Sequence, residues 1–572
     1  MTRTSATLLL LLFLLCQHSI SRVEGAESKL VKQDAAGRLV MLPWNAQGDR
    51  LPDFSYCGYR NGGVKLPVVQ TLATLEPSGA EDESGRIQAA LDDLGKSLEK
   101  TPDVRGALLL KKGLWKVNKP LTLSYSGLVL RGDGDGEDGT VLLATMKDGK
   151  TPLIAVSHKD LGPDDPTFAG LKDMLAQPYV PVGATRFKTT ANNLKPGDEI
   201  SIVRLGTQEW LAAIGMDAFP PATKVCQWKP ERFNLVFVRK VLSCADGELA
   251  FDIPLPQSLD QRYGGAFVLP APPVPRIREC GVESLRVDST FDPTIVATSG
   301  RGTLTNNVPV DENHLVMAVS FDKVEDAWLR NCTAIHLVNG LAVFGKFSRR
   351  VTAQDCRTLD PVSTLGGGRR YGFLLYRGSN QILVQRCSGR NNRHDFLTGS
   401  ILPGPNAFVD CNSELAWDGT ENHQQWAMGT LFDGIRVSGP RTGLFAANRG
   451  RWGGGSGHGW TGNTTVFWNC ASTVIFANQP PLGQNFMIGN SDPKLFDPEQ
   501  AKMWINGLNN PSGRNDELCE GTLQGTAWKE FPNESVTPRS LYYAQLEARL
   551  GKAAVENVTT EAQRRRNLEK CQ

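Results

Sequence analysis

The sequence predicts an all-β protein whose main body is a parallel β-helix, and two observations carry this prediction. Short segments with alternating apolar residues recur through the centre of the chain, and five of them end at a cysteine, at positions 332, 356, 387, 411 and 470. A repeat of about 20–50 residues that holds short strands is typical of a solenoid or a propeller. Spacings of 24 residues are too short for a propeller blade, and no helical pattern separates the units as in a βαβ sheet.

The repeated cysteines are predicted to be structural. The 59-residue gap before Cys470 holds a further strand-like unit at 430–437 and so spans two repeats, and an earlier unit at 282–287 has the same alternation without a cysteine. One residue type repeated in register is expected to form an interior ladder of small, unreactive side chains. Disulfides between neighbouring cysteines are the alternative. A zinc ribbon is excluded because the sequence has no Cys-x-x-Cys pair.

Residues 1–25 are predicted to be a secretory signal peptide. Arg3 supplies a positive charge, an apolar stretch runs from Leu8 to Leu15, and Val23 and Gly25 precede a cleavage site at Ala26. The apolar stretch is much shorter than the about 20 residues that a membrane span needs, and no later run reaches that length. We therefore expect a secreted or periplasmic protein without a membrane span.

The segment 26–175 is expected to hold a capping helix and the first coils of the β-helix. Residues 81–100 have apolar side chains at helical spacing, with Ser84 as the candidate N-cap. Short strands follow within residues 106–130, separated by Gly, Lys and Pro. A β-helix has an open end with unpaired backbone groups, and we expect the helix to cover that end.

The rest of the chain divides by pattern into three segments. Residues 176–272 are predicted to form a small antiparallel β insert that leaves through a proline-rich stretch, and 273–490 to form the central β-helix. The repeat is lost in 491–572, where residues 540–551 and 561–570 are predicted as surface helices. The candidate functional residues fall in the central segment, which holds five of the seven histidines.

The run ESGRIQAALDD and the strands from GALLL to LVLRGDG, within residues 83–134, resemble the opening of pectate-lyase-superfamily proteins. The resemblance covers about residues 81–160 and 275–480, and it implies a secreted, right-handed parallel β-helix. Other runs, such as NRHDFLTGSILPGPNAFVDC at 392–411 and ENHQQWAMGTLFDGI at 421–435, are similar to a distinct branch of that superfamily for which the resemblance implies no particular activity.

The densest polar cluster of the chain is Arg390 to Asp395, directly after a predicted strand. A polysaccharide lyase needs a base to remove the proton next to a uronic-acid carboxylate, and cations that neutralise this carboxylate. We predict His394 as the base, Arg393 as a carboxylate clamp, and Asp395 as the group that orients His394. The alternative is a structural turn in which Asn and Asp satisfy the backbone and Arg pairs with Asp.

Other candidates are expected to join this cluster from neighbouring coils. Tyr371 is the predicted proton donor, Arg370 a second clamp, and His423 an assisting group. The predicted substrate-binding residues are Trp426, Arg451, His458 and Trp460. A tryptophan on a polar loop can stack on a sugar ring, but a place in the core is an equal alternative for Trp426.

The leading hypothesis is therefore a secreted carbohydrate-active protein that cleaves a uronic-acid polysaccharide by β-elimination. A glycoside hydrolase that pairs Asp395 with Asp418 or Asp433 is the second hypothesis, and a non-catalytic carbohydrate-binding or adhesion solenoid is the third. The loop Gly132–Asp138 is rich in Asp and Gly but lacks the EF-hand glutamate, so no metal or other cofactor is predicted. A net charge of only +2 argues against a nucleic-acid partner. The oligomeric state is left open.

Overall fold

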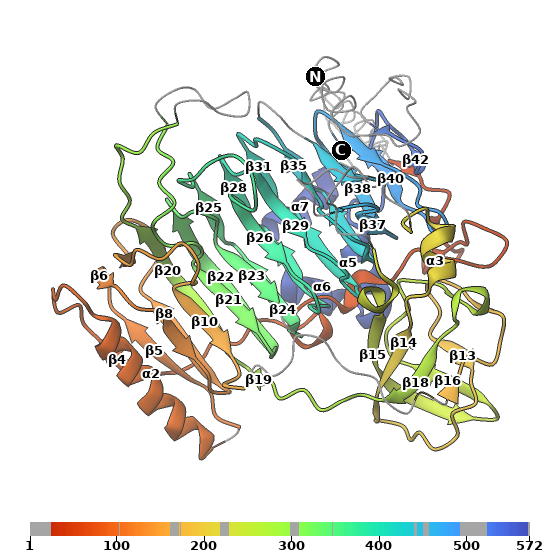
Figure 1. Cartoon of the computed structure of the whole chain (residues 1–572), viewed down its shortest axis with the longest axis horizontal. Helices are drawn as coiled ribbons and strands as arrows, with labels where there is room; N and C mark the ends of the chain where they lie inside the picture. Colours follow the sequence, from red (N-terminus) through yellow and green to blue (C-terminus); the bar gives the residue numbers. More distant parts are fainter. Residues whose placement is uncertain are drawn as a thin grey trace, which may run out of the picture.

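The body of the molecule is a right-handed parallel β-helix, which confirms the predicted fold class (Figure 1). The computed structural model describes residues 25–101, 103–160, 171, 173–217, 228–297, 308–345, 347–439, 443–449, 457–491 and 523–569. Residues 1–24, where the signal peptide is predicted, lie outside these ranges. In the described part of the chain, no helix is both long and apolar enough to cross a membrane.

Successive coils stack as parallel strands in two large sheets. The ten-stranded sheet contains β7 (Leu121–Leu123), β10 (Ile154–Ser157), β21 (Val319–Asp322), β23 (Ala342–Gly345), β26 (Tyr371–Leu375), β29 (His394–Thr398), β32 (Thr420–Asn422), β36 (Leu444–Ala446), β39 (Ile475–Ala477) and β41 (Leu523–Gln524). The nineteen-stranded sheet contains β4 (Thr71–Leu75), β5 (Gly106–Leu110), β6 (Gly113–Val117), β8 (Leu128–Gly132), β9 (Thr140–Ala144), β19 (Ile277–Arg278), β20 (Gly281–Ser289), β22 (Val324–Ile335), β24 (Arg349–Gln354), β25 (Arg357–Leu359), β27 (Leu383–Gln385), β28 (Ser388–Arg390), β30 (Asn406–Val409), β31 (Asn412–Glu414), β34 (Thr430–Asp433), β35 (Arg436–Val437), β38 (Val466–Cys470), β40 (Phe486–Asn490) and β42 (Trp528–Glu530). Their inner faces enclose one apolar core.

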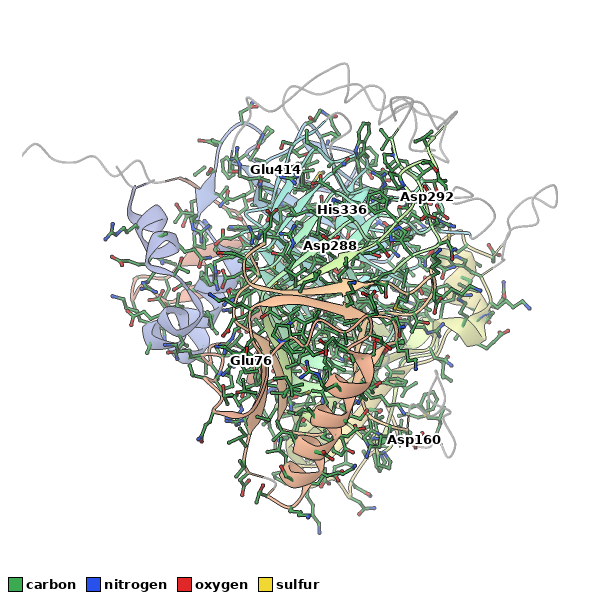
Figure 2. All side chains as sticks on the ribbon, turned by 90° about the vertical axis from the view of Figure 1, so that its left-hand side faces the viewer. Glu76, Asp160, Asp288, Asp292, His336 and Glu414 are labelled. Atoms are coloured by element: carbon green, nitrogen blue, oxygen red, sulfur yellow. The ribbon has the colours of Figure 1, made fainter. Side chains whose placement is uncertain are left out.

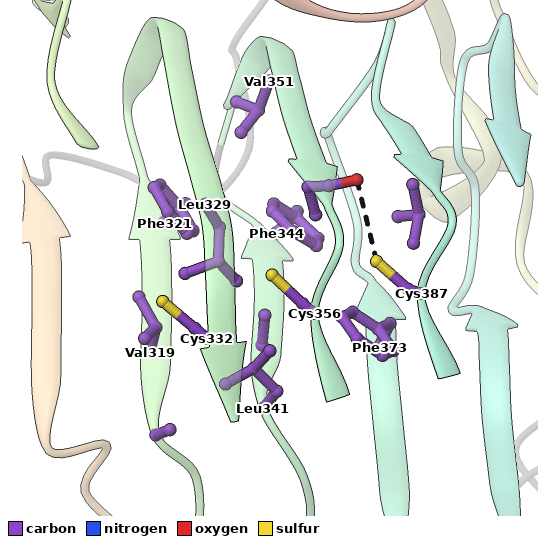
Figure 3. Close-up of a cluster of buried hydrophobic side chains, with 14 of the residues drawn as sticks. Val319, Phe321, Leu329, Cys332, Leu341, Phe344, Val351, Cys356, Phe373 and Cys387 are labelled. Carbon is purple, nitrogen blue, oxygen red and sulfur yellow. Dashed lines mark hydrogen bonds between the residues drawn. The ribbon is translucent and has the colours of Figure 1, made fainter. Parts of the chain in front are cut away.

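The five cysteines form the predicted interior ladder. All five are free thiols, and each is at most 2% exposed. The first three lie side by side in a row across neighbouring coils, next to a row of phenylalanines (Figure 3). The Cys387 thiol donates to the backbone oxygen of Ala353 at 3.8 Å. The register also places Leu285 beside Cys332, and Ile435 between Cys411 and Cys470. The unit at 430–437 is thus the extra coil that the 59-residue gap predicted.

The polar residue before each ladder position has a structural reason. Asn331, Asp355, Arg386, Asp410, Gly434 and Asn469 all have φ between 47° and 65°. This left-handed conformation turns the chain between two strands of a coil, and it is tolerated best by Gly, Asn and Asp. The sequence pattern "polar residue, then cysteine" therefore marks one corner of the five coils that carry a ladder cysteine.

Helix α2 (Ser84–Glu99) covers the N-terminal end of the β-helix, as predicted (Figures 1 and 2). Its residues Ile87, Leu91, Leu94 and Leu98 are buried against the first coils. The prediction for Ser84 was wrong, because the N-cap is Glu83 and Ser84 is the first helical residue. The Ser84 hydroxyl instead accepts the backbone N–H groups of Asn118 and Lys119, at 3.0 Å each, and so ties the helix to the coil beneath it.

An antiparallel sheet branches off between β10 and β20. Six of its strands are β11 (Asp173–Met174), β13 (Arg186–Lys188), β14 (Glu199–Arg204), β15 (Leu235–Ala245), β16 (Glu248–Phe251) and β18 (Phe267–Pro270), while β12 (Tyr179–Val180) pairs with β17 (Leu259–Asp260). We call this part the insert. Its core includes Ile401, Trp426 and Met428 of the central coils, so it packs directly on the β-helix near the ten-stranded sheet.

Three helices follow the last coil: α5 (Leu541–Leu550), α6 (Lys552–Val558) and α7 (Glu561–Glu569). Helix α5 was predicted as a surface helix, but it buries Leu541, Tyr542 and Leu546 against the outer side of the nineteen-stranded sheet. The Asp433 carboxylate accepts the Ser540 hydroxyl at 2.7 Å and the Tyr542 N–H at 2.9 Å. This buried carboxylate therefore fastens the start of α5 to strand β34.

Candidate active site

Three adjacent strands of the ten-stranded sheet bring the predicted residues together. Strand β29 pairs with β26 in a register that sets His394 beside Tyr371, and it pairs with β32 so that Leu397 lies beside Glu421. In a parallel β-helix such register stacks side chains from positions about 25 residues apart on one wall. Residues that are distant in the sequence thus become neighbours at this point of the sheet.

A chain of hydrogen bonds runs through three of these side chains. The Tyr371 hydroxyl lies 3.1 Å from His423 Nε2, and His423 Nδ1 pairs with Glu421 Oε1. We refer to Tyr371, His423 and Glu421 as the Tyr–His–Glu chain. The carboxylate at Nδ1 selects the imidazole tautomer that leaves Nε2 free to accept the tyrosine proton. His458 adds a fourth group, with its Nε2 3.3 Å from Nε2 of His423.

His458 reaches this position because of its flanking glycines and the insert. Gly457 and Gly459 have φ of +59° and +52°, conformations that glycine adopts without strain. Trp228 of the insert donates its indole N–H to the Gly457 carbonyl at 2.8 Å. A Cβ atom on Gly459 would lie 2.6 Å from the Met216 sulfur. The Gly-His-Gly run therefore lets the chain pass tightly under the insert while the imidazole points at His423.

Two arginines place positive charge beside the Tyr–His–Glu chain. Arg449 Nη1 lies 3.0 Å from Glu421 Oε1 and donates to the His423 carbonyl at 3.1 Å. Arg393 contacts Asp418 through Nε at 3.2 Å, and its guanidinium carbon lies 5.9 Å from the centre of the Tyr371 ring. The side chains of Asp418, Arg449 and Arg393 are 23%, 15% and 12% exposed, so these charged groups are the most accessible part of the cluster.

Burial sets the protonation states of these groups. It raises the pKa of Tyr371 above its ordinary value, which keeps the phenol protonated. Burial and the neighbouring Arg449 lower the pKa of His423 well below its ordinary value. The same two causes lower the pKa of His458 to about 2. Both imidazoles are therefore neutral near pH 7. Burial alone would raise the pKa of Asp418, but His394 and Arg393 bring it down to about 2. The site thus combines a protonated acid, neutral bases and paired charges.

One triplet of ligand-type side chains has the spacing of a cation site. Single ligand atoms of His394, Glu421 and His423 lie within 4.8 Å of one another. However, Arg449 Nη1 contacts both Glu421 Oε1, at 3.0 Å, and His423 Nδ1, at 3.1 Å. A guanidinium already neutralises the carboxylate where a cation would be bound, so the triplet is better suited to proton transfer than to metal binding.

His394 lies in the cluster, but its surroundings do not suit the predicted role of base. Its side chain is fully buried, and Nδ1 donates to the Gly419 carbonyl at 2.5 Å. Its ring packs edge-on against the rings of Tyr371 and His423, with centroids 5.3 and 5.0 Å away, and burial lowers its pKa to about 3. His394 is therefore placed to hold the other two rings rather than to meet a ligand.

The prediction that Asp395 orients His394 was wrong. Adjacent strand residues point to opposite faces, and Asp395 points into the coil, where it accepts from Asn392 at 2.6 Å and from the Ser413 hydroxyl. Burial raises the pKa of this carboxyl to about 7. Asp433 is committed to helix α5, so neither aspartate pairs with Asp418 as the hydrolase hypothesis requires.

Three further predicted residues are bound elsewhere. The Arg370 guanidinium is fully buried and donates to the carbonyls of Ser363 and Asn391, so it does not clamp a substrate. Trp426 is also fully buried; its indole N–H donates to Gln257 at 3.1 Å, and its ring meets Trp210 edge-on. Its place is the core beneath the insert, the alternative named above. Trp460 is half-buried and donates to the Ile214 carbonyl at 2.8 Å, and Arg451 lies outside the described residues.

Sequence reasoning did not assign a role to Glu421 or Arg449, although both are central to the site. Glu421 stands two positions before His423, and residues at i and i+2 of an extended chain share a face. That spacing was the signal that could have identified the pair. His336, in contrast, pairs with Asp288 at 3.0 Å at another part of the β-helix, where Figure 2 labels both residues, and it takes no part in the site.

Comparison with known proteins gives structural likeness only. No family model and no curated protein matches the sequence. One similar solved structure is the tailspike protein gp49 of Pseudomonas phage LKA1, with 11% identity and a TM-score of 0.41; the match covers 71% of this chain and 63% of that chain. Another is the tailspike of E. coli bacteriophage HK620 in complex with a pentasaccharide, with 10% identity and a TM-score of 0.36; the match covers 82% of this chain and 61% of that chain. A third is the DFA-IIIase of Arthrobacter chlorophenolicus A6 in complex with GF2, with 10% identity and a TM-score of 0.31; the match covers 73% of each chain. The match thus spans less than two thirds of either tailspike chain. With TM-scores below 0.5, these likenesses assign neither an activity nor a substrate, and membership of the pectate-lyase superfamily stays a prediction.

Proposed function

We propose that this protein is a carbohydrate-active enzyme that cleaves a uronic-acid polysaccharide by β-elimination. The observation that carries the proposal is the 3.1 Å contact between the Tyr371 hydroxyl and His423 Nε2, next to the guanidinium of Arg393. It supplies a proton donor, a neutral proton acceptor and a cation in one place, which are the three components that such an elimination needs. We further propose, from residues 1–25, that the chain is secreted or periplasmic.

In the proposed reaction, His423 replaces His394 as the base. His423 Nε2 removes the proton at C5 of the uronate, the electrons of that C–H bond form the C4=C5 double bond, and the C4–O bond to the leaving sugar breaks. Tyr371 gives its proton to the leaving oxygen. His423 then returns its newly acquired proton to the Tyr371 oxygen across their hydrogen bond, which restores both groups without an external reagent.

The charged residues support these proton transfers. Glu421 accepts from His423 Nδ1 and stabilises the imidazolium that forms, as carboxylates do for catalytic histidines. Within the described part of the chain, Arg393 forms hydrogen bonds to other side chains only through Nε, so its two terminal nitrogens are available to grip the uronate carboxylate in the bidentate geometry that arginine favours. Withdrawing charge from this carboxylate stabilises the carbanion-like transition state.

The test is a screen of uronic-acid polysaccharides for the ultraviolet absorbance of the new double bond, which is conjugated with the carboxylate. Tyr371→Phe removes only the hydroxyl and should lower the rate about 10²–10⁴-fold, the usual contribution of a general acid. His336→Ala, in a histidine outside the site, is the matched control and should leave the rate unchanged. New reducing ends without this absorbance would indicate hydrolysis, and binding without either product would indicate a non-catalytic solenoid. Either result, or full activity of Tyr371→Phe, would refute the proposal.

A further inference from the structure

A polar cavity lies apart from the Tyr–His–Glu chain. Its volume is about 350 Å³, at the lower end of the range for small-molecule sites. Its walls come from the insert, the N-terminal segment and the last coils, and include Trp44, Arg204, Asp260 and Trp528. None of the residues of the candidate active site lines it.

Arg204 brings a buried guanidinium to this cavity, whose other charged lining residues are Arg262, Asp49 and Asp260. Arg204 ends strand β14 and is only 2% exposed, and within the described residues its side chain makes neither a hydrogen bond nor an ion pair. Its Nη1 atom is buried without a partner. The Trp210 ring compensates part of the charge, with its centre 4.3 Å from the guanidinium carbon. Burying an unpaired guanidinium is costly, so this position favours an anionic ligand.

The two carboxylates that line the cavity are bonded to other groups. Asp49 accepts from the Tyr179 hydroxyl at 2.8 Å and from the Val182 N–H at 2.7 Å. Asp260 accepts from the side chain of Arg262 at 2.6 to 3.1 Å and from the Arg262 backbone N–H at 2.9 Å. Arg262 is exposed and compensates Asp260 at the surface. Burial lowers the pKa of Arg204 to about 9 in spite of the attraction of Asp260, which shows how poorly the cavity solvates this charge. An added carboxylate would supply the missing partner.

The remaining walls suit a sugar ring. Trp44 and Trp528 both line the cavity and are half-buried, and Trp44 is held edge-on against Phe486 with ring centroids 4.9 Å apart. Aromatic rings that are fixed in this way offer flat apolar faces to the C–H side of a sugar. Ser258, Gln257 and Gln484 add hydroxyl and amide groups to the lining, and such groups exchange hydrogen bonds with sugar hydroxyls.

We propose that this cavity is a second binding site for a carboxylate-bearing sugar, with Arg204 paired to the carboxylate and Trp44 against the ring. The carboxylate follows from Arg204 itself, whereas the identification of the ligand as a uronate rests on the proposed function. In this arrangement the insert holds one residue of a polysaccharide at a distance from the site of cleavage.

The test uses full-length protein that carries Tyr371→Phe, so that no substrate is cleaved, and calorimetric titration with galacturonate and glucuronate. Galactose and glucose are the neutral controls. We expect two uronate sites per chain and at least tenfold weaker binding of the neutral sugars. Adding Arg204→Met, which keeps the length of the side chain but removes its charge, should abolish one of the two sites. Arg186→Met, on an exposed strand of the same insert, should leave both.

A second variant keeps the test decisive if Arg204→Met does not fold. Trp44→Ala should weaken the same site at least tenfold, and Trp44→Phe should restore most of the affinity. A single site that is indifferent to both variants, or equal binding of acidic and neutral sugars, would overturn the inference. Its failure is separable from that of the proposed function. If the wild-type protein shows no cleavage but Arg204→Met still removes one uronate site, only the cleavage reaction is refuted. If the wild-type protein cleaves its substrate but Arg204→Met leaves the number of uronate sites unchanged, only the second site is refuted.

Discussion

Replacing Asp395 with asparagine should make the protein more stable at neutral pH, and the gain should disappear in acid. Asp395 is fully buried, and burial raises the pKa of its carboxyl from the ordinary 3.8 to about 7 in spite of the bonds from Ser413 and Asn392. Between these two values the folded protein holds a proton that the unfolded chain has released. The contribution of this group to the free energy of unfolding is therefore complete below pH 3.8 and is lost as the pH rises through 7.

The size of the effect follows from the pKa difference. At about 1.36 kcal/mol per pH unit, the wild-type protein loses about 4 kcal/mol between pH 4 and pH 8 through this carboxyl. The asparagine side chain of the variant carries no charge, and its amide can still accept from Asn392 and donate to Ser413. With an unfolding entropy of about 2.1 cal/mol/K per residue, the melting temperature of Asp395→Asn should rise by about 3–4 °C relative to wild type across this range.

Thermal unfolding of both proteins at pH 4, 6 and 8 measures this difference directly. Asp93→Asn, on the exposed face of helix α2, is the matched control and should track the wild type at every pH. A difference between Asp395→Asn and wild type that does not change with pH would refute the reasoning, because the carboxyl would then not be buried in its protonated form. The variant should also retain its cleavage rate, which it would not if Asp395 oriented a catalytic histidine.

Three further predictions concern the site and the ladder. Glu421→Gln should lower the cleavage rate at least tenfold with little change in KM, since Glu421 acts through His423 and not on the substrate; an unchanged rate would remove it from the mechanism. The pH profile of kcat should be broad, with its acid limb below the ordinary histidine value of 6.5 and its alkaline limb above the ordinary tyrosine value of 10, because burial lowers the pKa of His423 and raises that of Tyr371. Limbs inside that window would contradict the assigned roles. A thiol reagent should label the five ladder cysteines only after denaturation, as peptide mapping would show; labelling of the native protein would place them outside the core.

The stacking of the central coils could be predicted because each coil repeats two constraints. An interior position of fixed size favours cysteine, and the corner before it needs a residue that tolerates positive φ, such as Asp410 or Asn469. Both constraints leave a mark in the sequence at each turn. The meeting of Tyr371, His394, His423 and His458 was predicted on the same basis, since parallel register carries equivalent positions onto one wall.

The roles of the individual residues were harder to predict because each depends on the side of the strand that a side chain occupies. Arg393, His394 and Asp395 are consecutive, yet Arg393 faces the solvent edge, His394 packs between two aromatic rings, and Asp395 points into the coil. A cluster along the sequence is therefore not a cluster in space. Because successive strand residues point to opposite faces of the sheet, the sequence already indicated that the side chains of His394 and Asp395 do not lie on the same face.

The insert accounts for the remaining differences, because no local pattern shows where a distant segment will be packed. The insert buries Trp426 and accepts a hydrogen bond from the Trp460 indole N–H. It also fixes the loop of His458 through the hydrogen bond from Trp228 to Gly457. The same packing that removes Trp426 from the list of sugar-binding residues thus positions an imidazole beside His423. The insert also supplies Arg204 and Trp210 to the polar cavity beside Trp44. A single antiparallel sheet therefore contributes to both sites, and changes in its packing on the coils should alter cleavage and remote binding together.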